Sequence, residues 1–209
     1  MRSRRLPLVL SGIFLFLLFI LFSYLVHKDL FTQLDFDTTV RLQDKIPTFF
    51  TTPFSILSLV ASFEIVSVFL LILWIFIRKM RYIFVLFFFA FFHFLELYGK
   101  AFVNHPGPPY LFFRYDIPFA FPTSYVQPGS SYPSGHLART LFVSVILMFI
   151  IYNSKKLSMF KKRLLFCLTV IIVMLMFISR IYLGEHWLSD VLGGTLLGAS
   201  AGVLSLIFL

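Results

Sequence analysis

The sequence has little of what an ordinary soluble protein is built from. Only 13% of its 209 residues are charged, and nine are acidic. Its one cysteine, Cys167, lies inside an apolar run, which excludes an internal disulfide and a cysteine-based metal site. Hydrophobic residues make up 59% of the chain, and thirty residues are phenylalanine. This composition excludes a soluble domain and predicts a polytopic membrane protein.

Long apolar runs alternate with short polar segments along the whole chain. A transmembrane helix needs about 20 mostly apolar residues, and six runs reach this length once their ends extend into the flanking polar residues. The first run follows three arginines, but no small-residue cleavage site comes after it, so we expect a retained helix. No repeat or linker divides residues 1–209, which predicts a single all-α membrane domain. The six predicted spans are Leu8–Val26, Phe54–Ile77, Tyr82–Tyr98, Leu137–Tyr152, Leu164–Ser179 and Leu188–Leu209.

Basic residues are concentrated in the segments on one side of the predicted membrane. The positive-inside rule makes this side cytoplasmic, with both termini inside. The net charge of +9 is therefore a signal of topology and of attraction to anionic lipid, and it indicates no nucleic-acid partner. These segments contain none of the nine acids but eleven of the eighteen Lys and Arg residues: Arg2, Arg4, Arg5, Arg78, Lys79, Arg81, Lys155, Lys156, Lys161, Lys162 and Arg163.

Two segments on the opposite, outer side differ in character. His27–Pro53 mixes apolar and acidic residues at helical spacing, which predicts an amphipathic helix lying in the interface. Gly99–His136 holds seven of the ten prolines, which forbids a regular helix. We expect this outer loop to be a packed cap on lipid headgroups rather than a lid. Its aromatic residues include Tyr110, Phe112, Phe113, Tyr115, Phe119, Phe121 and Tyr125.

The third outer segment, Ser179–Asp190, brings an arginine, a histidine and an aspartate into twelve residues. His186 and Asp190 are four apart and would share one face of a helix. Asp190 would then accept a hydrogen bond from one ring nitrogen of His186 and leave the other free to attack or to bind. Arg180 offers a planar, always-charged fork to phosphate oxygens. The alternative is a surface loop whose aspartate caps a helix.

The fourth and sixth spans carry further signals. Pro133-Ser134-Gly135-His136 opens the fourth span from outside. Its glycine lets the backbone approach a ligand, Ser134 and the first helix amides can hold an anion, and His136 can donate a proton. In the sixth span, small residues at four-residue spacing let another helix approach closely. These small residues are Gly194, Gly198 and Gly202.

Glu64, His93 and Glu96 lie within the second and third predicted spans. Glu96 lies four residues before Lys100, which predicts an ion pair along one helix. Glu64 lies near the outer end of its span, where it would reach water. We expect His93 to be an interior histidine that is satisfied by a neighbour rather than a ligand.

With these residues the chain resembles the type-2 phosphatidic acid phosphatase and vanadium haloperoxidase superfamily. The signature of that family has three parts: Lys, six residues, Arg-Pro; then Pro-Ser-Gly-His; then Ser-Arg, five residues, His, three residues, Asp. The second part is complete at 133–136, and the third is complete at 179–190. The first part is partial: Lys100 and Pro108 match, but Gly107 stands where the family has arginine.

The resemblance implies a lipid phosphatase with six membrane helices, no cofactor and no metal. Its substrate would be a lipid phosphate or diphosphate at the outer face of a bacterial plasma membrane, of the polyprenyl diphosphate or phosphatidylglycerol phosphate type. His186 would be the nucleophile that forms a phosphohistidine, Asp190 would orient it, and His136 would protonate the leaving oxygen. The phosphoryl oxygens would be held by Lys100, Arg180, Ser134 and the amide of Gly135.

The missing arginine leaves other functions to weigh. His105 and Arg114 are candidates to replace its charge, although Arg114 lies seven residues beyond the family position. One alternative is a lipid phosphotransferase with the same histidine chemistry, and another is a non-catalytic, lipid-binding family member. A transporter is disfavoured because the polar residues gather at one interface rather than at the bilayer midplane. The sequence indicates no particular oligomeric state.

Overall fold

The structure, a computed structural model, describes residues 2–77, 80–117 and 129–209, and these residues are helical with no β-strand among them. The all-α prediction is therefore confirmed. Four short 3₁₀ turns, η1 to η4, connect or end the helices at Thr48–Phe50, Met80–Tyr82, Tyr110–Phe112 and Leu206–Phe208. The α-helices are α1 Arg2–His27, α2 Thr32–Lys45, α3 Thr51–Val60, α4 Phe63–Ile77, α5 Ile83–Phe102, α6 Gly135–Asn153, α7 Met159–Tyr182 and α8 Leu188–Ser205.

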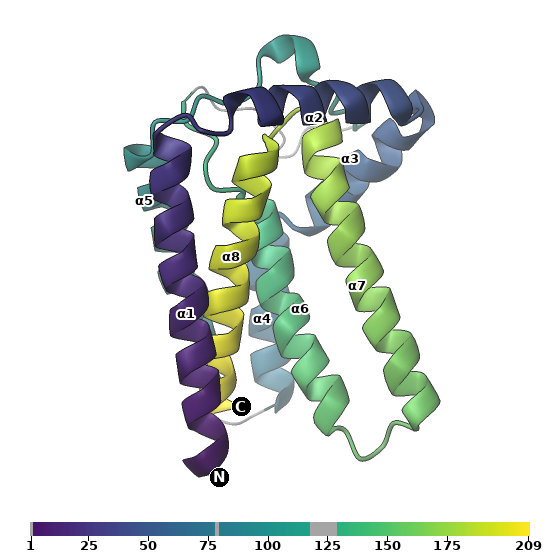
Figure 1. Cartoon of the computed structure of the whole chain (residues 1–209). Coiled ribbons are helices and arrows are strands. Elements are labelled where there is room, and N and C mark those ends of the chain that lie inside the picture. The colour runs from purple at the N-terminus through teal and green to yellow at the C-terminus, as the bar shows by residue number, and fades with distance from the viewer. Residues whose placement is uncertain (1, 78–79, 118–128) are drawn as a thin grey trace.

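Within the described residues, five helices are long and apolar enough to cross a membrane, and α3 and α4 together make a sixth candidate span (Figure 1). The sequence predicted this span over Phe54–Ile77, and the structure adds a bend of 49° between its two halves. At the bend the amide of Ile65 donates to the hydroxyl of Ser62 rather than to the carbonyl of Ala61. That carbonyl instead accepts from the side chain of Arg139 on α6, over 2.9 Å. A side chain inserted into the helical hydrogen-bond ladder is a known cause of a sharp kink.

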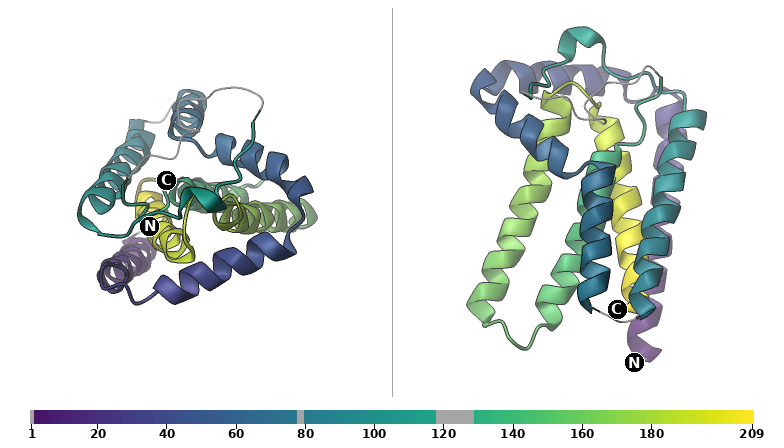
Figure 2. Two further views of the ribbon diagram at one scale, coloured as in Figure 1. Left: turned by 90° about the horizontal axis from the view of Figure 1, so that it is seen from above. Right: turned by 180° about the vertical axis from the view of Figure 1, so that it is seen from behind.

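Helix α8 packs against α1, α5 and α6, and Figure 2 shows it amid the other spans. The small residues predicted to permit close approach face α6. A Cβ added at Gly198 would lie 2.1 Å from the carbonyl oxygen of Ala138, and one added at Gly194 would lie 2.3 Å from that of Ser134. The prediction of a close helix contact at these glycines is confirmed, and the contact fixes the start of α8 against the start of α6.

Helix α2 lies across one end of the bundle, roughly perpendicular to the spans (Figures 1 and 2). The predicted interfacial helix is therefore present. Polar residues at four-residue spacing, Asp35, Thr39 and Gln43, are buried against the bundle. Apolar residues such as Leu34 and Phe36 remain exposed on α2. The helix thus offers hydrophobic side chains to the interface and turns a polar stripe toward the ends of the other helices.

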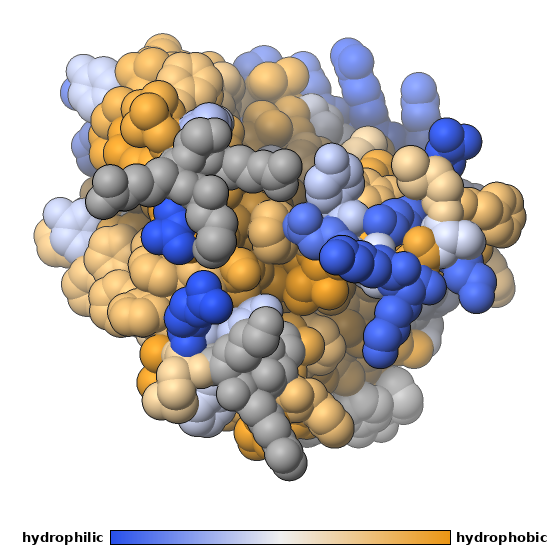
Figure 3. Space-filling view, turned by 90° about the horizontal axis from the view of Figure 1, so that it is seen from below, coloured by the Kyte–Doolittle hydropathy of each residue, from blue (hydrophilic) through white to orange (hydrophobic). Residues whose placement is uncertain are grey.

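Both chain ends lie at the end of the bundle opposite α2, as Figure 1 shows. Exposed lysines of the turn between α6 and α7 lie at this end too, and Figure 3 shows hydrophilic side chains gathered there beside an apolar surface. The lysines of this turn and the two termini thus share one end of the bundle, as the six-span topology predicted. The predicted residues Arg78 and Lys79, and the side chains of Arg2 and Arg4, lie outside what is described.

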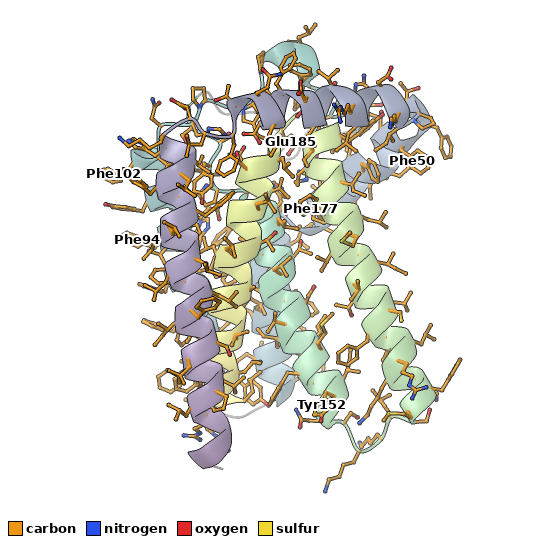
Figure 4. All side chains as sticks on the ribbon, in the orientation of Figure 1. Phe50, Phe94, Phe102, Tyr152, Phe177 and Glu185 are labelled. Carbon is orange, nitrogen blue, oxygen red and sulfur yellow. The ribbon has the colours of Figure 1, made fainter. Side chains whose placement is uncertain are left out.

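Aromatic side chains cover the outside of the spans as well as their core. Phe94 and Phe102 point away from the bundle on α5 (Figure 4) and are more than half exposed. Inside, the rings of Phe89, Phe92 and Phe142 pack with centroids 5.1 to 5.8 Å apart. An apolar exterior of this kind is what a lipid-facing surface requires, and the chain is an integral membrane protein.

The described part of the outer loop packs on the bundle, as expected for a cap. The side-chain amide of Gln43 on α2 donates to the carbonyls of Phe112 and Tyr182, over 2.6 and 2.8 Å. The amide of Arg114 donates to the carbonyl of Leu183, and the indole of Trp187 donates to the carbonyl of Pro106. The loop is therefore tied both to α2 and to the chain between α7 and α8. The predicted aromatics Phe119, Phe121 and Tyr125 lie outside the described residues.

Candidate active site

The two complete motifs meet at the end of the bundle covered by α2. Ser134 is the N-cap of α6, and its backbone amide donates to the carbonyl oxygen of Asp190 over 2.9 Å. Asp190 lies in the first turn of α8, and His186 lies in the short connection from α7. The beginnings of two helices and the end of a third thus converge on one place. Helix beginnings present free amides and favour anions.

His186 and Asp190 lie beside each other, but not on one helix as the sequence predicted, because α8 begins at Leu188, after His186. Nδ1 of His186 lies 3.4 Å from Oδ2 of Asp190, which is within ion-pair range but is not a hydrogen bond. The same Oδ2 accepts the backbone amide of Trp187 over 2.9 Å. Asp190 therefore caps α8 and lies beside the imidazole, so both interpretations of this residue apply. Because Nδ1 faces the carboxylate, Nε2 is the nitrogen left for chemistry.

Arg180 is fully buried, an uncommon situation for an arginine. Its Nη1 donates to the carboxylate of Glu185, while its Nη2 has no partner among the described residues. Figure 4 shows Glu185 beneath α2, between the ends of α7 and α8. Sequence reasoning did not single out Glu185, although an acid five residues after an arginine in the same polar segment was a usable signal.

Lys100 forms the predicted ion pair with Glu96, with 3.2 Å between Nζ and Oε1. Glu96 also accepts from Nη1 of Arg139 over 2.8 Å and lies 3.0 Å from Nδ1 of His93. The expectation that His93 is a satisfied interior histidine is thereby confirmed. Glu64 is exposed at the start of α4. Arg139 is buried and was missed, although an arginine one turn after Pro-Ser-Gly-His in an apolar span was a visible signal.

The Glu96 carboxylate reaches the start of α6. A Cβ built on Gly135 would lie 1.8 Å from Oε1 of Glu96, so a residue with a side chain at 135 would displace that carboxylate. His136, the next residue, is partly exposed, and the charges acting on it are those of Arg180, Arg139, His186 and Lys100. The two histidines and these cations therefore occupy one small region.

Four buried side-chain polar atoms among the described residues have no hydrogen-bond partner: Ser134 Oγ, Arg180 Nη2, His186 Nδ1 and Asp190 Oδ1. Buried polar groups are normally satisfied, and each exception calls for an explanation. All four belong to residues predicted for the site, and they come from α6, α7, α8 and the connection before α8. Of these, the hydroxyl of Ser134 and the guanidinium of Arg180 are suited to hold an anion such as a phosphoryl group, whereas Nδ1 of His186 faces the carboxylate of Asp190.

Arg114 and His105, the two residues that could replace the charge of the missing arginine, do not lie among the predicted phosphate-binding side chains. Nη1 of Arg114 donates to the backbone carbonyl of Gln43, and its guanidinium lies 5.3 Å above the Tyr182 ring. Nε2 of His105 lies 3.0 Å from Ser189 Oγ and 3.5 Å from Asp190 Oδ1. Neither side chain contacts Ser134, Arg180 or Lys100 through a hydrogen bond in the described structure. Gly107 itself has space, since a Cβ there would meet nothing nearer than Ser131 at 3.4 Å.

Acidic groups around the site are perturbed by burial. Burial raises the pKa of Asp35, and two hydrogen bonds from Ser189 act against this increase. Burial, followed by the nearby charge of Glu185, raises the pKa of Tyr115 in the outer loop. In the described ranges no cluster of three or more His, Cys, Asp or Glu side chains has the arrangement of a metal site.

Fold and site together define a class: a polytopic helical membrane protein that holds two histidines, an aspartate beside one of them and several cations at one end of its bundle. The sequence model of the PAP2 superfamily matches residues 78–209, which is more than half of the 209 residues. The chain belongs to the PAP2 superfamily.

A curated protein and a solved structure, both from Bacillus subtilis, match the chain. Phosphatidylglycerophosphatase B of strain 168 is 42% identical over 69 residues, which are 32% of this chain and 34% of that protein. The match thus spans about a third of the length of this relative. The crystal structure of the first transmembrane PAP2 type phosphatidylglycerolphosphate phosphatase superposes over 93% of both chains, with a TM-score of 0.74 and 21% identity.

A second solved structure, LpxE of Aquifex aeolicus, covers 83% of this chain and 94% of its own, with a TM-score of 0.61 and 24% identity. At such identities the likeness establishes the fold. The overall arrangement of the helices therefore has solved examples.

Proposed function

We propose that the protein is a membrane phosphatase that hydrolyses a lipid phosphomonoester or diphosphate through a phosphohistidine. The observation that carries this proposal is that two buried donors without a hydrogen-bond partner, Ser134 Oγ and Arg180 Nη2, lie at the same end of the bundle as His186 and Asp190. Such groups are arranged in advance for a charged oxygen, and phosphoryl transfer depends mainly on positioning and charge stabilisation. The surrounding lipid-facing spans favour a substrate that is itself a lipid.

The residues have the following roles in this proposal. Nε2 of His186 attacks phosphorus, the bond from phosphorus to the lipid oxygen breaks, and His136 gives its proton to that oxygen. A water molecule then attacks the phosphohistidine, His136 takes a proton from the water, and the phosphorus–nitrogen bond breaks to release phosphate. Asp190 orients His186 throughout. The phosphoryl oxygens are held by Lys100, Arg180, Ser134 and the amide of Gly135.

Two further parts of the proposal concern placement. The basic end of the bundle faces the cytoplasm with both termini, so the site opens at the outer face of a bacterial plasma membrane. The 209 residues act as one domain. Among lipids, phosphatidylglycerol phosphate is the first to test, because relatives named for it match both the sequence and the fold. Polyprenyl diphosphates are the second.

Phosphate release by the purified protein in detergent tests the function. A panel of lipid monophosphates and diphosphates is incubated with EDTA, beside His186→Ala and the control His27→Ala, which changes an exposed histidine at the end of α1. We expect release that tolerates EDTA, persists in His27→Ala and disappears in His186→Ala. Full release by His186→Ala would refute the mechanism. A phosphorylated acceptor in place of free phosphate would identify a phosphotransferase, and lipid binding without turnover would identify a non-catalytic member.

A further inference from the structure

A buried polar network lies on the side of Asp190 that faces away from His186. It consists of Asp35 on α2, His105 in the outer loop, and Ser189 and Asp190 at the start of α8. Nε2 of His105 lies 3.0 Å from Ser189 Oγ, 3.5 Å from Asp190 Oδ1 and 3.6 Å from Asp35 Oδ2. All four side chains are at most 5% exposed. Two carboxylates and an imidazole in so small a buried volume require a defined pattern of protons.

The hydrogen bonds of Ser189 fix that pattern. Its backbone amide donates to Oδ1 of Asp35 over 2.8 Å, and its hydroxyl donates to Oδ2 over 2.7 Å. Because the hydroxyl hydrogen points to Asp35, a lone pair of the same oxygen faces His105. The imidazole therefore carries a hydrogen on Nε2 and donates it. Asp35 thus sets the tautomer of His105 through Ser189.

This N–H edge of His105 also faces Oδ1 of Asp190. Oδ1 has no hydrogen-bond partner in the described structure, whereas Oδ2 accepts from Trp187 and lies beside His186. The two oxygens of Asp190 therefore face different groups. The hydrogen on Nε2 is bonded to Ser189, but its positive end lies 3.5 Å from Oδ1, attracts that oxygen electrostatically and so favours the orientation in which Oδ2 lies beside the imidazole of His186. Residues that orient a ligating or catalytic group in this way commonly change activity about 10- to 100-fold when removed.

The same contacts argue against a phosphate-binding role for His105. Its Nε2 is committed to Ser189 and lies 3.6 Å from the carboxylate of Asp35, and a negative group there repels a phosphoryl oxygen. The histidine that the sequence suggested as a substitute for the missing arginine is thus turned toward Asp190.

We propose that His105 and Asp35 are positioning residues that hold Asp190, and through it His186, in the reactive geometry. This inference rests on the proposed phosphatase function. It makes the surface helix α2 part of the active machinery, since Asp35 is its most deeply placed acid.

Steady-state kinetics separate positioning from phosphate binding. We expect His105→Ala and Asp35→Asn to lower kcat roughly 10- to 100-fold while KM and inhibition by vanadate change less than about twofold. His105→Gln places an amide N–H where Nε2 was, so it should recover much of the loss. The double variant should lose little more kcat than His105→Ala alone, because Asp35 acts through His105.

Two controls match these variants. Asp37→Asn removes a carboxylate from the same helix whose side chain bonds Gln33 instead. His27→Ala removes an exposed histidine that accepts from the amide of Asn104, directly beside His105. We expect both controls to behave as wild type. If kcat fell in these controls as much as it falls in His105→Ala, the proposal would be overturned, because the effect would then come from a loosened loop.

Other results would contradict the proposal as clearly. If His105→Ala raised KM and weakened vanadate inhibition without changing kcat, His105 would be a phosphate ligand. If the kinetics of His105→Ala and Asp35→Asn were unchanged, the network would have no role in catalysis. A readout without substrate covers the case in which wild type releases no phosphate and the proposed function fails. Diethyl pyrocarbonate should modify His186 more slowly in His105→Ala than in wild type, as mapped by mass spectrometry. An equal or faster rate would refute the positioning role.

Discussion

Ser134 donates its backbone N–H to the carbonyl oxygen of Asp190 over 2.9 Å, and this bond joins two motifs that are 56 residues apart. The bond aligns the first turn of α6 with the first turn of α8. It sets the Pro-Ser-Gly-His segment beside the nucleophile candidate without using a side chain of either residue. The hydroxyl of Ser134 and the carboxylate of Asp190 therefore stay available to the site.

Replacement of His136 tests the role of the proton donor. His136→Ala should lower kcat roughly 10²- to 10⁴-fold, because a positioned general acid contributes about that factor. The loss should be smaller for a lipid analogue with a good leaving group such as p-nitrophenol, which needs little protonation. Equal losses on both substrates would assign His136 to binding rather than to proton transfer.

Restoring the family arginine tests whether the phosphate site lacks a cation. The backbone at 107 has room for a side chain, since an added Cβ meets only Ser131 at contact distance. Gly107→Arg should tighten inhibition by vanadate roughly 10- to 100-fold, the equivalent of a charge-assisted hydrogen bond of about 1.5–3 kcal/mol. Gly107→Ala is the control for the backbone change and should leave inhibition as it is. No change in Gly107→Arg would indicate that the charge is already supplied.

The buried pair of Glu96 and Arg139 predicts a large effect on stability. Arg139→Met removes the buried partner of Glu96, leaving only Lys100 and His93 beside that carboxylate, and leaves the Ala61 carbonyl unpaired, so it should destabilise the protein by about 3–5 kcal/mol. Thermal unfolding in detergent measures the loss. Adding Glu96→Gln to Arg139→Met should restore part of it, because the buried charge is then removed. A double variant that is less stable than Arg139→Met would contradict this pairing.

The glycine contact between α6 and α8 predicts a steric effect. Gly198→Ala would put a methyl group 2.1 Å from the carbonyl oxygen of Ala138, so the helices must separate. Overpacking of this kind typically costs about 1–3 kcal/mol. The melting temperature should fall, and activity should fall with it because Ser134 and Asp190 move apart. If Gly198→Ala had the same melting temperature as wild type, α6 could move aside without any loss in the free energy of unfolding.

Asp35 predicts a dependence of stability on pH. Burial raises its pKa above the ordinary value of 3.8, so the folded protein binds this proton more tightly than the unfolded chain. The contribution to stability is therefore complete below the ordinary pKa and is lost as the pH rises through the raised value. As the pH rises from about 4, the melting temperature of wild type should fall relative to that of Asp35→Asn. A difference that is constant with pH would show that Asp35 titrates normally.

Several features were predictable from sequence because they depend on composition and spacing. The apolar runs set the number of spans, and the motif residues Ser134, Arg180, His186 and Asp190 converge as expected. Spacing also anticipated the ion pair of Glu96 with Lys100. These signals are local, or they repeat along one helix, so a single chain displays them.

Other features depend on partners that are distant in the chain. The bend between α3 and α4 leaves no trace in hydropathy, because both halves are apolar and Ala61 is bonded by an arginine 78 residues later. The position of His105 could not be read from its segment, since Asp35 and Ser189 come from other elements. The same holds for α2, whose buried face is polar where an amphipathic helix suggests an apolar one.

The bend at Ala61 also has a consequence for how the chain is assembled in the membrane. The residues of α3 and α4 are synthesised and inserted before Arg139 exists, so the carbonyl of Ala61 must at first find its partner locally or in water. The bent shape gains its hydrogen bond when α6 arrives. We therefore expect a segment already in the bilayer to rearrange when α6 arrives, before α7 and α8 follow, and a chain truncated before α6 to retain a straighter, more deeply inserted α3–α4 segment.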